Sequence, residues 1–397
     1  MSTPAHALGQ EPVQKHVFDN GVVSLWTLSN DTQAIADAVI AAAQLEPMAV
    51  AIVWYSRHII DVAALGQTLS SLAPDLPVCG CSTCGEITPA GMQASGCVIV
   101  LLPVRQFDVS ISLIKDIDRA GMQQIAQVAS TARQSFMQSR LYNTTNTFAL
   151  TLIDGLTFTE EATTAALQRG LDDIPLIGGS AGDDLGFDRT DLLHGGKVHE
   201  RAAVLLLVHS RLPFRLFTDN NFVPTTRKLV VTRSDPDRRI VHELNGLPAA
   251  SVYADAIGTT RDELNATSFA AHALILRIGG ENFCRSIQSV NAQDDSLTFF
   301  CAIDDGLVLT VAESEGMVRS SRSMIDSIEA DIGHIECMIG FDCIYRKLDA
   351  AHRGVTDRME SLLREKNFVG YNTYGEQFRS MHVNQTFTGV AFASPAT

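Results

Sequence analysis

The sequence predicts an α/β N-terminal domain built from a duplicated strand-helix-strand unit, followed by an α+β C-terminal domain. Two observations lead to this fold class. In the first half, strands alternate with helices, and the order strand, helix, strand, turn and strand occurs twice. After residue 210 the chain changes to polar, alternating strands separated by hairpin turns. We therefore expect domains at 20–212 and 225–394, preceded by an N-terminal extension at 1–19.

The first copy of the unit begins with an apolar run at 50–55, which predicts a buried strand. A helix is expected at 62–72, because apolar residues recur there at helical spacing and Pro74 follows. A short strand at 77–80 then leads into a glycine-containing turn. The run CVIVLL at 97–102 is apolar on both faces, which is typical of a strand covered on both sides.

The second copy has the same order of elements, with strands at 148–153, 174–178 and 202–208. Thr159 is expected to cap its helix, because two glutamates follow in the first turn. The second half of the chain adds longer helices to its polar strands. Outside the two copies we expect helices at 31–44, 122–137 and 319–331, a strand at 335–344, a long charged helix at 346–366 and a last strand at 386–392.

The composition narrows the class of protein. Of 397 residues, 46% are hydrophobic and 19% are charged, so the chain can bury a core in each domain. A net charge of −15 would repel a phosphate backbone, and we expect no nucleic-acid partner. The apolar runs are far shorter than the roughly 18 residues that a membrane helix needs, and the N-terminus lacks a signal-peptide pattern. We expect a cytoplasmic protein without membrane association.

The turn after the second strand of each copy could hold a small ligand. Glycines and small hydroxyls let backbone amides approach a ligand closely at the carboxyl ends of strands. Neither turn has a lysine or a Walker motif, so a nucleotide site is not indicated. The turns could equally be structural pivots of the duplicated unit. The residues concerned are Gly80, Ser82, Thr83, Gly85 and Glu86 in the first turn and Gly178, Gly179, Ser180, Gly182 and Asp183 in the second.

Four cysteines form a second candidate site. Cys79, Cys81 and Cys84, with Cys97 further along, have a spacing that would suit zinc or an iron–sulfur cluster. The second copy has no cysteine at the corresponding positions, which favours small buried thiols over metal ligands. The chain has no His-Glu-x-x-His motif or Asp-rich metal loop, and we expect no catalytic activity.

Several side chains could ligate a haem iron. In the C-terminal stretch, His382 lies among aromatic residues that include Tyr371 and Tyr374. A neutral imidazole is the usual protein ligand of haem iron, and a tyrosine is the second choice here. His334 and His58, each beside an apolar strand, are rival ligands. For any of these histidines the ordinary alternative is a hydrogen-bonded part of the scaffold.

Several segments resemble the FIST proteins, whose paired N-terminal and C-terminal domains form a sensory module. The resemblance runs from about residue 20 to residue 393. With no kinase, receiver or cyclase domain attached, the chain is most similar to the stand-alone nitric-oxide-sensing haem proteins of that family. The segments are PVCGCSTCGEI (77–87), PLIGGSAGDD (175–184), HIECMIGFDCIYR (334–346), YGEQF (374–378) and HVNQTFTG (382–389).

This resemblance implies a sensor that binds haem b, detects nitric oxide and relays the signal to a partner histidine kinase or cyclic-di-GMP enzyme in biofilm regulation. The family's histidine before the Asn-Gln-Thr strand falls on His382, here separated from Asn384 by Val383. The family's two glycine-containing turns fall on the two turns described above. A diatomic gas is the expected ligand, and the sequence leaves a homodimer open.

Two other interpretations stay open. One is a haem-free sensory module in which the two turns enclose an amino-acid-like ligand with their backbone amides. The other, from a different class, is a thiol or iron–sulfur protein that uses Cys79, Cys81, Cys84 and Cys97.

Overall fold

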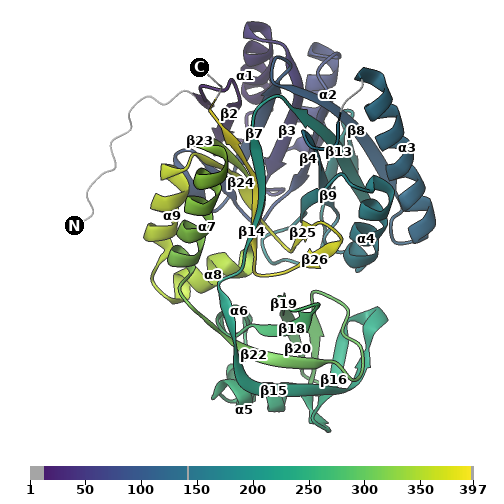
Figure 1. The fold of residues 1–397 in the computed structure, drawn as a ribbon, viewed down its shortest axis with the longest axis vertical. Helices are drawn as coiled ribbons and strands as arrows, with labels where there is room; N and C mark the ends of the chain where they lie inside the picture. Colours follow the sequence, from purple (N-terminus) through teal and green to yellow (C-terminus); the bar gives the residue numbers. More distant parts are fainter. Residues whose placement is uncertain (1–12, 141–142, 395–397) are drawn as a thin grey trace.

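The computed structural model describes residues 13–140 and 143–394. Figure 1 shows a larger part with most of the helices, here called the main body, and below it a smaller β-rich part. The smaller part consists of residues 222–314 and is here called the insert. Residues 1–12 of the expected extension lie outside the described residues, and the rest of it contains β1 (Gln14–Val17).

The first sheet of the main body has the strand order β1-β2-β7-β3-β4-β11-β12. Every residue of β7 is buried, as its apolar composition predicts. Two helices, α1 and α2, pack on this sheet, and each begins after an aspartate that accepts a backbone N–H bond of 3.0 Å. The bounds are β2 (Val23–Thr27), α1 (Thr32–Leu45), β3 (Met48–Tyr55), α2 (Val62–Leu72), β4 (Val78–Ser82), β7 (Cys97–Pro103), β11 (Leu192–His194) and β12 (Lys197–His199).

The second sheet has the order β26-β25-β10-β9-β13-β8, and the helices α3 and α4 pack on it. Thr159 precedes α4 as predicted, although its side chain makes no capping hydrogen bond. The bounds are β8 (Phe107–Lys115), α3 (Met122–Arg140), β9 (Thr147–Ile153), α4 (Glu160–Leu171), β10 (Leu176–Ser180), β13 (Ala202–Ser210), β25 (Glu376–Phe378) and β26 (Met381–Val383).

The third sheet has the order β14-β27-β23-β24-β5-β6. The single helix predicted at 346–366 is wrong: there are two helices, because Gly354 between them takes a left-handed conformation with φ of 64°. The bounds are β5 (Glu86–Thr88), β6 (Gly91–Gln93), β14 (Phe214–Asp219), α7 (Met317–Ile332), β23 (Ile335–Cys343), α8 (Ile344–His352), α9 (Thr356–Glu365), β24 (Phe368–Thr373) and β27 (Phe387–Ala393).

Three hairpins join the sheets to one another. Each sheet contains one parallel pair of strands, β3 with β4, β9 with β10, and β23 with β24. The hairpin that follows each pair leaves its own sheet: β5–β6 pairs with β24, β11–β12 with β4, and β25–β26 with β10. The second and third sheets therefore combine strands from both sides of the expected domain boundary.

The insert leaves the main body after β14 and returns to it before α7. It holds an eight-stranded sheet with the order β19-β18-β22-β15-β16-β21-β20, in which β17 pairs with β16. Its bounds are β15 (Phe222–Asp235), η1 (Pro236–Arg238), β16 (Ile240–Leu244), β17 (Leu247–Pro248), α5 (Ala249–Ile257), η2 (Arg261–Glu263), α6 (Ala266–Ala271), β18 (Leu274–Ile278), β19 (Glu281–Arg285), β20 (Ile287–Asn291), β21 (Ser296–Phe299) and β22 (Val308–Ser314).

Candidate functional site

The two turns predicted from the sequence lie together, and a third turn at 373–376 joins them. The turns follow β4, β10 and β24, the second strand of each parallel pair. Four bonds from a backbone N–H to a backbone carbonyl connect them: Ser180 to Gly375 (2.8 Å), Gly182 to Ser82 (3.1 Å), Cys84 to Asn372 (2.9 Å) and Asn372 to Gly85 (2.8 Å).

The sequence analysis missed the third turn, although a signal for it exists. Thr373 and Glu376 stand in a Thr-x-Gly-Glu motif that also occurs at Thr83 and Glu86. In both motifs the threonine hydroxyl donates to the glutamate Oε1, over 2.6 Å in the first. The shared motif therefore corresponds to a shared local structure.

The small residues of the turns allow close packing between them. A side-chain carbon on Gly182 would lie 2.2 Å from the Cys84 sulfur. One on Gly178 would lie 2.4 Å from the carbonyl oxygen of Thr151, on the neighbouring strand β9. The turns thus touch each other directly, and their role in ligand binding stays a prediction.

Residues 178–182 also form a Gly-x-Ser-x-Gly pattern, the pattern of a nucleophile elbow. In this chain Ser180 is fully buried, and a loop and β11 follow it instead of a helix. Its hydroxyl accepts a hydrogen bond of 2.9 Å from Gln377 Nε2. The serine therefore belongs to the packed centre of the main body rather than to an exposed nucleophile.

Two buried carboxyls lie in the turns. Burial raises the pKa of Glu86 to about 7, although hydroxyls of Thr83 and Ser56 donate to it. Burial likewise raises the pKa of Glu376 to about 8, with Thr386 donating to its Oε2 at 2.7 Å. Glu376 is therefore mostly protonated at neutral pH.

His382, the predicted haem ligand, lies on β26 and is only 3% exposed. Its Nδ1 is 3.2 Å from Gln377 Nε2, and the hairpin register places these two residues opposite each other. Burial lowers the pKa of His382 to about 4, which leaves the imidazole neutral at pH 7. A neutral imidazole is the form that can bind a metal.

The surroundings of His382 do not fit a porphyrin. Its Nδ1 faces Gln377, and a side-chain carbon on Gly375 would lie 2.8 Å from its Nε2. A large cavity does lie at this hairpin, but Met381 and Val383 line it, and residues alternate between the two faces of a strand. His382 therefore points away from that cavity. Haem b stays a prediction without geometric support at this residue.

The amide of Asn384 lies beside His382. The sequence analysis did not treat Asn384 as a site residue. Asn384 is fully buried, and within the described residues neither of its amide atoms has a hydrogen-bond partner. A side-chain carbon on Gly375 would lie close to both the His382 ring and the Asn384 amide. Such a group suits a water or a small polar molecule rather than a porphyrin.

The other predicted iron ligands are dispersed. Tyr371 is fully buried beside Trp54, with ring centroids 5.3 Å apart. The Tyr374 hydroxyl donates to Asp183 of the second turn. His334 and His58 are exposed, and each lies at the surface of the main body; the ring of His58 is 3.1 Å from the carboxylate of Asp184.

The four cysteines of the predicted metal site are not brought together. Cys79 and Cys81 lie in one hydrophobic core, Cys84 in a second and Cys97 in a third. Burial raises the pKa of all four thiols, which opposes thiolate formation. Within the described residues no three His, Cys, Asp or Glu side chains form a metal-binding group. The iron–sulfur interpretation has no support in this arrangement and stays a prediction.

A cavity of about 660 Å³ lies where the hairpin β25–β26 faces β19 of the insert. This volume is within the usual range for small-molecule sites. The residues that line it are Thr218, Asn220, Gly280, Glu281, Asn282, Phe283, Cys284, Phe378, Arg379, Ser380, Met381, Val383 and Thr386. None of them was predicted as a site residue, because the two sides of the cavity are about a hundred residues apart in the chain.

Two charges of opposite sign border this cavity. Arg379 and Glu281 are both exposed, and in the described part of the chain neither takes part in an ion pair. The Arg379 guanidinium lies 5.7 Å from the centre of the Phe378 ring. The cavity thus combines a cation, an anion and an apolar wall.

The main body and the insert therefore meet at a cavity whose size is usual for small-molecule sites, and comparisons with known protein families place this arrangement in a class of sensory modules. The chain belongs to the FIST family: the FIST N domain matches residues 49–247, and the FIST C domain matches residues 249–379. FIST domains are sensory domains that usually occur in signalling proteins, and they indicate a sensory signal-transduction module.

The matched domains meet at residues 247–249, inside the insert. An uncharacterized protein of Methanocaldococcus jannaschii is 22% identical over 380 residues, which cover 85% of this chain and 72% of that protein. Within the described residues, none of the helices has the length and apolar character needed to cross a membrane.

Proposed function

We propose that this protein senses a small zwitterionic ligand of the amino-acid class, without haem, in the cavity between β19 and the hairpin β25–β26. The observation that carries the proposal is the unpaired Arg379 and Glu281 at one partly apolar cavity. An α-carboxylate would pair with the guanidinium, and an α-ammonium group would pair with the carboxylate. Phe283 and Met381 offer apolar surface to the ligand side chain.

The position of the cavity suggests how binding would be transmitted. One wall belongs to the insert and the other to the main body, so a ligand that touches both stabilises the closed arrangement over an open one. The hairpin that carries Arg379 also carries Gln377, whose side chain contacts Ser180 at the centre of the three turns. Ligand contact and the packing of the turns therefore act on the same hairpin.

The test is isothermal titration calorimetry of the full chain with a panel of amino acids. We expect Arg379→Gln to weaken binding by roughly 10- to 100-fold, because it removes a charge-assisted hydrogen bond. Arg358→Gln is the matched control, since Arg358 is exposed on α9 and forms no ion pair within the described residues. Binding that is equally strong in both variants, or no binding by the wild type, contradicts the proposal.

The second candidate function is the detection of nitric oxide by haem b at His382. It is favoured by the neutral, buried imidazole of His382 and opposed by Gln377 and Gly375, which crowd its two ring nitrogens. An absorption spectrum of the haem-loaded protein tests it. A sharp Soret band that shifts with nitric oxide and is lost in His382→Ala, but kept in His334→Ala, supports it. A broad band of adsorbed haem refutes it.

We propose a histidine kinase or a cyclic-di-GMP enzyme as the cytoplasmic partner, because FIST domains usually occur in signalling proteins. A net charge of −15 favours a basic surface on that partner. We also infer that the main body arose by repetition of one strand-helix-strand unit, as predicted for the first half. This is supported by the parallel pair and the outgoing hairpin that are present in every one of its three sheets.

A further inference from the structure

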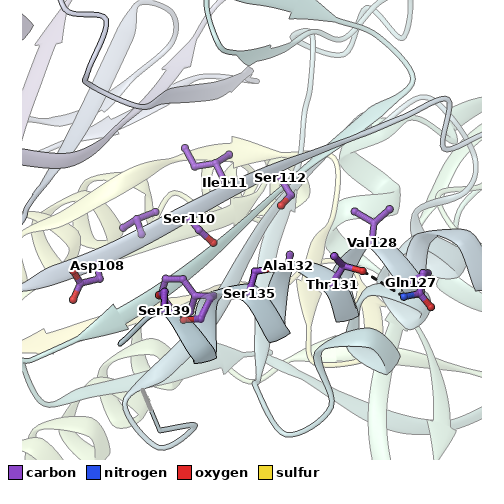
Figure 2. A pocket seen from close by; sticks show the side chains of 12 residues that line it. Asp108, Ser110, Ile111, Ser112, Gln127, Val128, Thr131, Ala132, Ser135 and Ser139 are labelled. Atoms are coloured by element: carbon purple, nitrogen blue, oxygen red, sulfur yellow. Dashed lines mark hydrogen bonds between the residues drawn. The ribbon is translucent and has the colours of Figure 1, made fainter. Parts of the chain in front are cut away.

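The end strand β8 and the helix α3 border an open groove of about 750 Å³ (Figure 2). β8 pairs with β13 on one side and ends the second sheet on the other. Its outer edge therefore offers backbone N–H and C=O groups for further pairing. Small side chains border this edge, namely Ser110 and Ser112 on β8 and Thr131, Ser135 and Ser139 on α3.

The first sheet shows what covers an edge of this kind. There β2 occupies the place that β8 has in the second sheet, because each pairs with the strand next to the parallel pair. The outer edge of β2 is covered by β1, which runs antiparallel to it from Gln14 to Val17. Within the described residues, the edge of β8 has no such neighbour. An antiparallel strand is therefore the form of chain that fits it.

We propose that this strand is β8 of a second copy of the protein. A two-fold axis through Ile111 would place Val109 opposite Leu113 of the second copy and Ser110 opposite its Ser112. The apolar pairs lie on one face and the serine pairs on the other, the face toward α3, so β8 is complementary to itself. Nine paired residues supply roughly eight to ten backbone hydrogen bonds.

The helices fit this arrangement as well. α3 contacts both β8 and β13, so it lies over the last two strands of the sheet. Neighbouring strands are about 4.8 Å apart, which brings the two α3 helices to roughly 10 Å, an ordinary helix-packing distance. Thr131, Ser135 and Ser139 recur at four-residue spacing on the side of the groove. Their small side chains leave room for this approach.

The charge distribution also favours a second copy. A net charge of −15 opposes contact between two copies through most of the surface. The groove differs in charge from the rest of the surface. Asp108 is the carboxylate among its described lining residues, and it forms an ion pair with Arg211. The β8 edge is thus a nearly neutral surface on an acidic protein.

Light scattering during size-exclusion chromatography of the full chain tests the proposal. The wild type is expected to elute with the mass of a dimer. Ser135→Arg places a charged, bulky side chain between the two α3 helices and is expected to raise the dimer dissociation constant at least tenfold. Gln134→Arg is the matched control: Gln134 is exposed on the same helix but does not line the groove, and this variant is expected to stay dimeric.

A disulfide cross-link tests whether the two-fold axis passes through Ile111. All eight native cysteines are buried, so an introduced cysteine would be the accessible one. Ile111→Cys is expected to form a disulfide-linked dimer under mild oxidation, whereas Gln134→Cys is not. A monomer at every concentration overturns the proposal, including a monomer that binds a strand of another protein. A dimer that Ser135→Arg leaves intact and Ile111→Cys does not cross-link overturns it too.

Discussion

At the scale of single residues, Glu376 holds a proton that the unfolded chain would release. Its carboxyl is buried, with a pKa of about 8 against an ordinary value of 4.5. Between these two values the folded protein binds more protons than the unfolded one, so the free energy of unfolding falls as the pH rises. Below the ordinary pKa the carboxyl is protonated in both states, and its burial does not lower the free energy of unfolding through ionisation.

We predict that Glu376→Gln flattens the pH dependence of stability between pH 6.5 and pH 8. The slope of the free energy of unfolding should change by up to about 1 kcal/mol per pH unit, because a single proton is involved. Urea denaturation at several pH values measures it. Glu313→Gln is the control, since Glu313 is exposed, and it should keep the wild-type slope. Equal slopes for Glu376→Gln and wild type would contradict the prediction.

The sequence could predict which side chains are suited to a site but not which way they face. His382 was identified by its residue type, and its neutrality follows from burial. Its orientation follows from the register of the hairpin, which sets it opposite Gln377 and directs Met381 to the cavity. A shift of one residue would exchange these faces. Composition and spacing contain no information about that register.

At the scale of elements, α4 connects the main body to the insert. The Arg239 guanidinium is 3% exposed and donates to Glu160 (2.6 Å) and Glu161 (2.5 Å) in the first turn of this helix. It also donates to the Phe300 carbonyl (2.7 Å), so one side chain of the insert joins its own strands to the main body. Removing one member of a buried ion pair leaves the other charge uncompensated.

We predict that Arg239→Met loosens the insert. The loss should reach about 3 kcal/mol locally and appear as faster amide hydrogen exchange in the insert and at the start of α4. Arg238→Met, at an exposed neighbouring position, should leave the exchange unchanged. If the amides of Arg239→Met keep their protection against hydrogen exchange, other contacts hold the insert and the main body together.

Local patterns predicted many elements, among them β3, β7, β13, α1 and α2, because their apolar residues recur at strand or helix spacing. The pairing between distant hairpins has no such local signal. β25 joins β10 across nearly two hundred residues through backbone bonds that every residue type except proline can make. For the same reason the cavity at Arg379 could not be predicted from the chain order.

At the scale of the whole molecule, the exchanged hairpins make the three sheets depend on one another. One hydrophobic core combines Trp54 and Leu152 from the first half with Phe341, Tyr371 and Phe392 from the last segment. A fragment limited to the expected N-terminal domain would expose this core and leave β10 without β25. The insert does not share this dependence. The backbone N–H of Glu315 donates to the carbonyl of Asn221 (2.9 Å), so the two ends of the insert are adjacent.

We predict that the fragment 20–212 does not unfold cooperatively, whereas a chain in which a short glycine-serine link replaces residues 222–314 does. Thermal melts followed by near-ultraviolet circular dichroism distinguish the two. The shortened chain should melt at a lower temperature than the full one, because the insert also covers Tyr345 and Tyr374. A sharp, reversible transition in the fragment would be inconsistent with the shared core.

The same exchange of hairpins has a consequence for synthesis on the ribosome. The strand β10 is complete early, but its neighbour β25 is translated nearly two hundred residues later, and β5 waits even longer for β24. During that interval the nascent chain carries open strand edges and an unfinished core, the features that promote aggregation. The main body closes only when its last strands leave the exit tunnel, so its folding cannot finish before residue 393 has emerged from the ribosome.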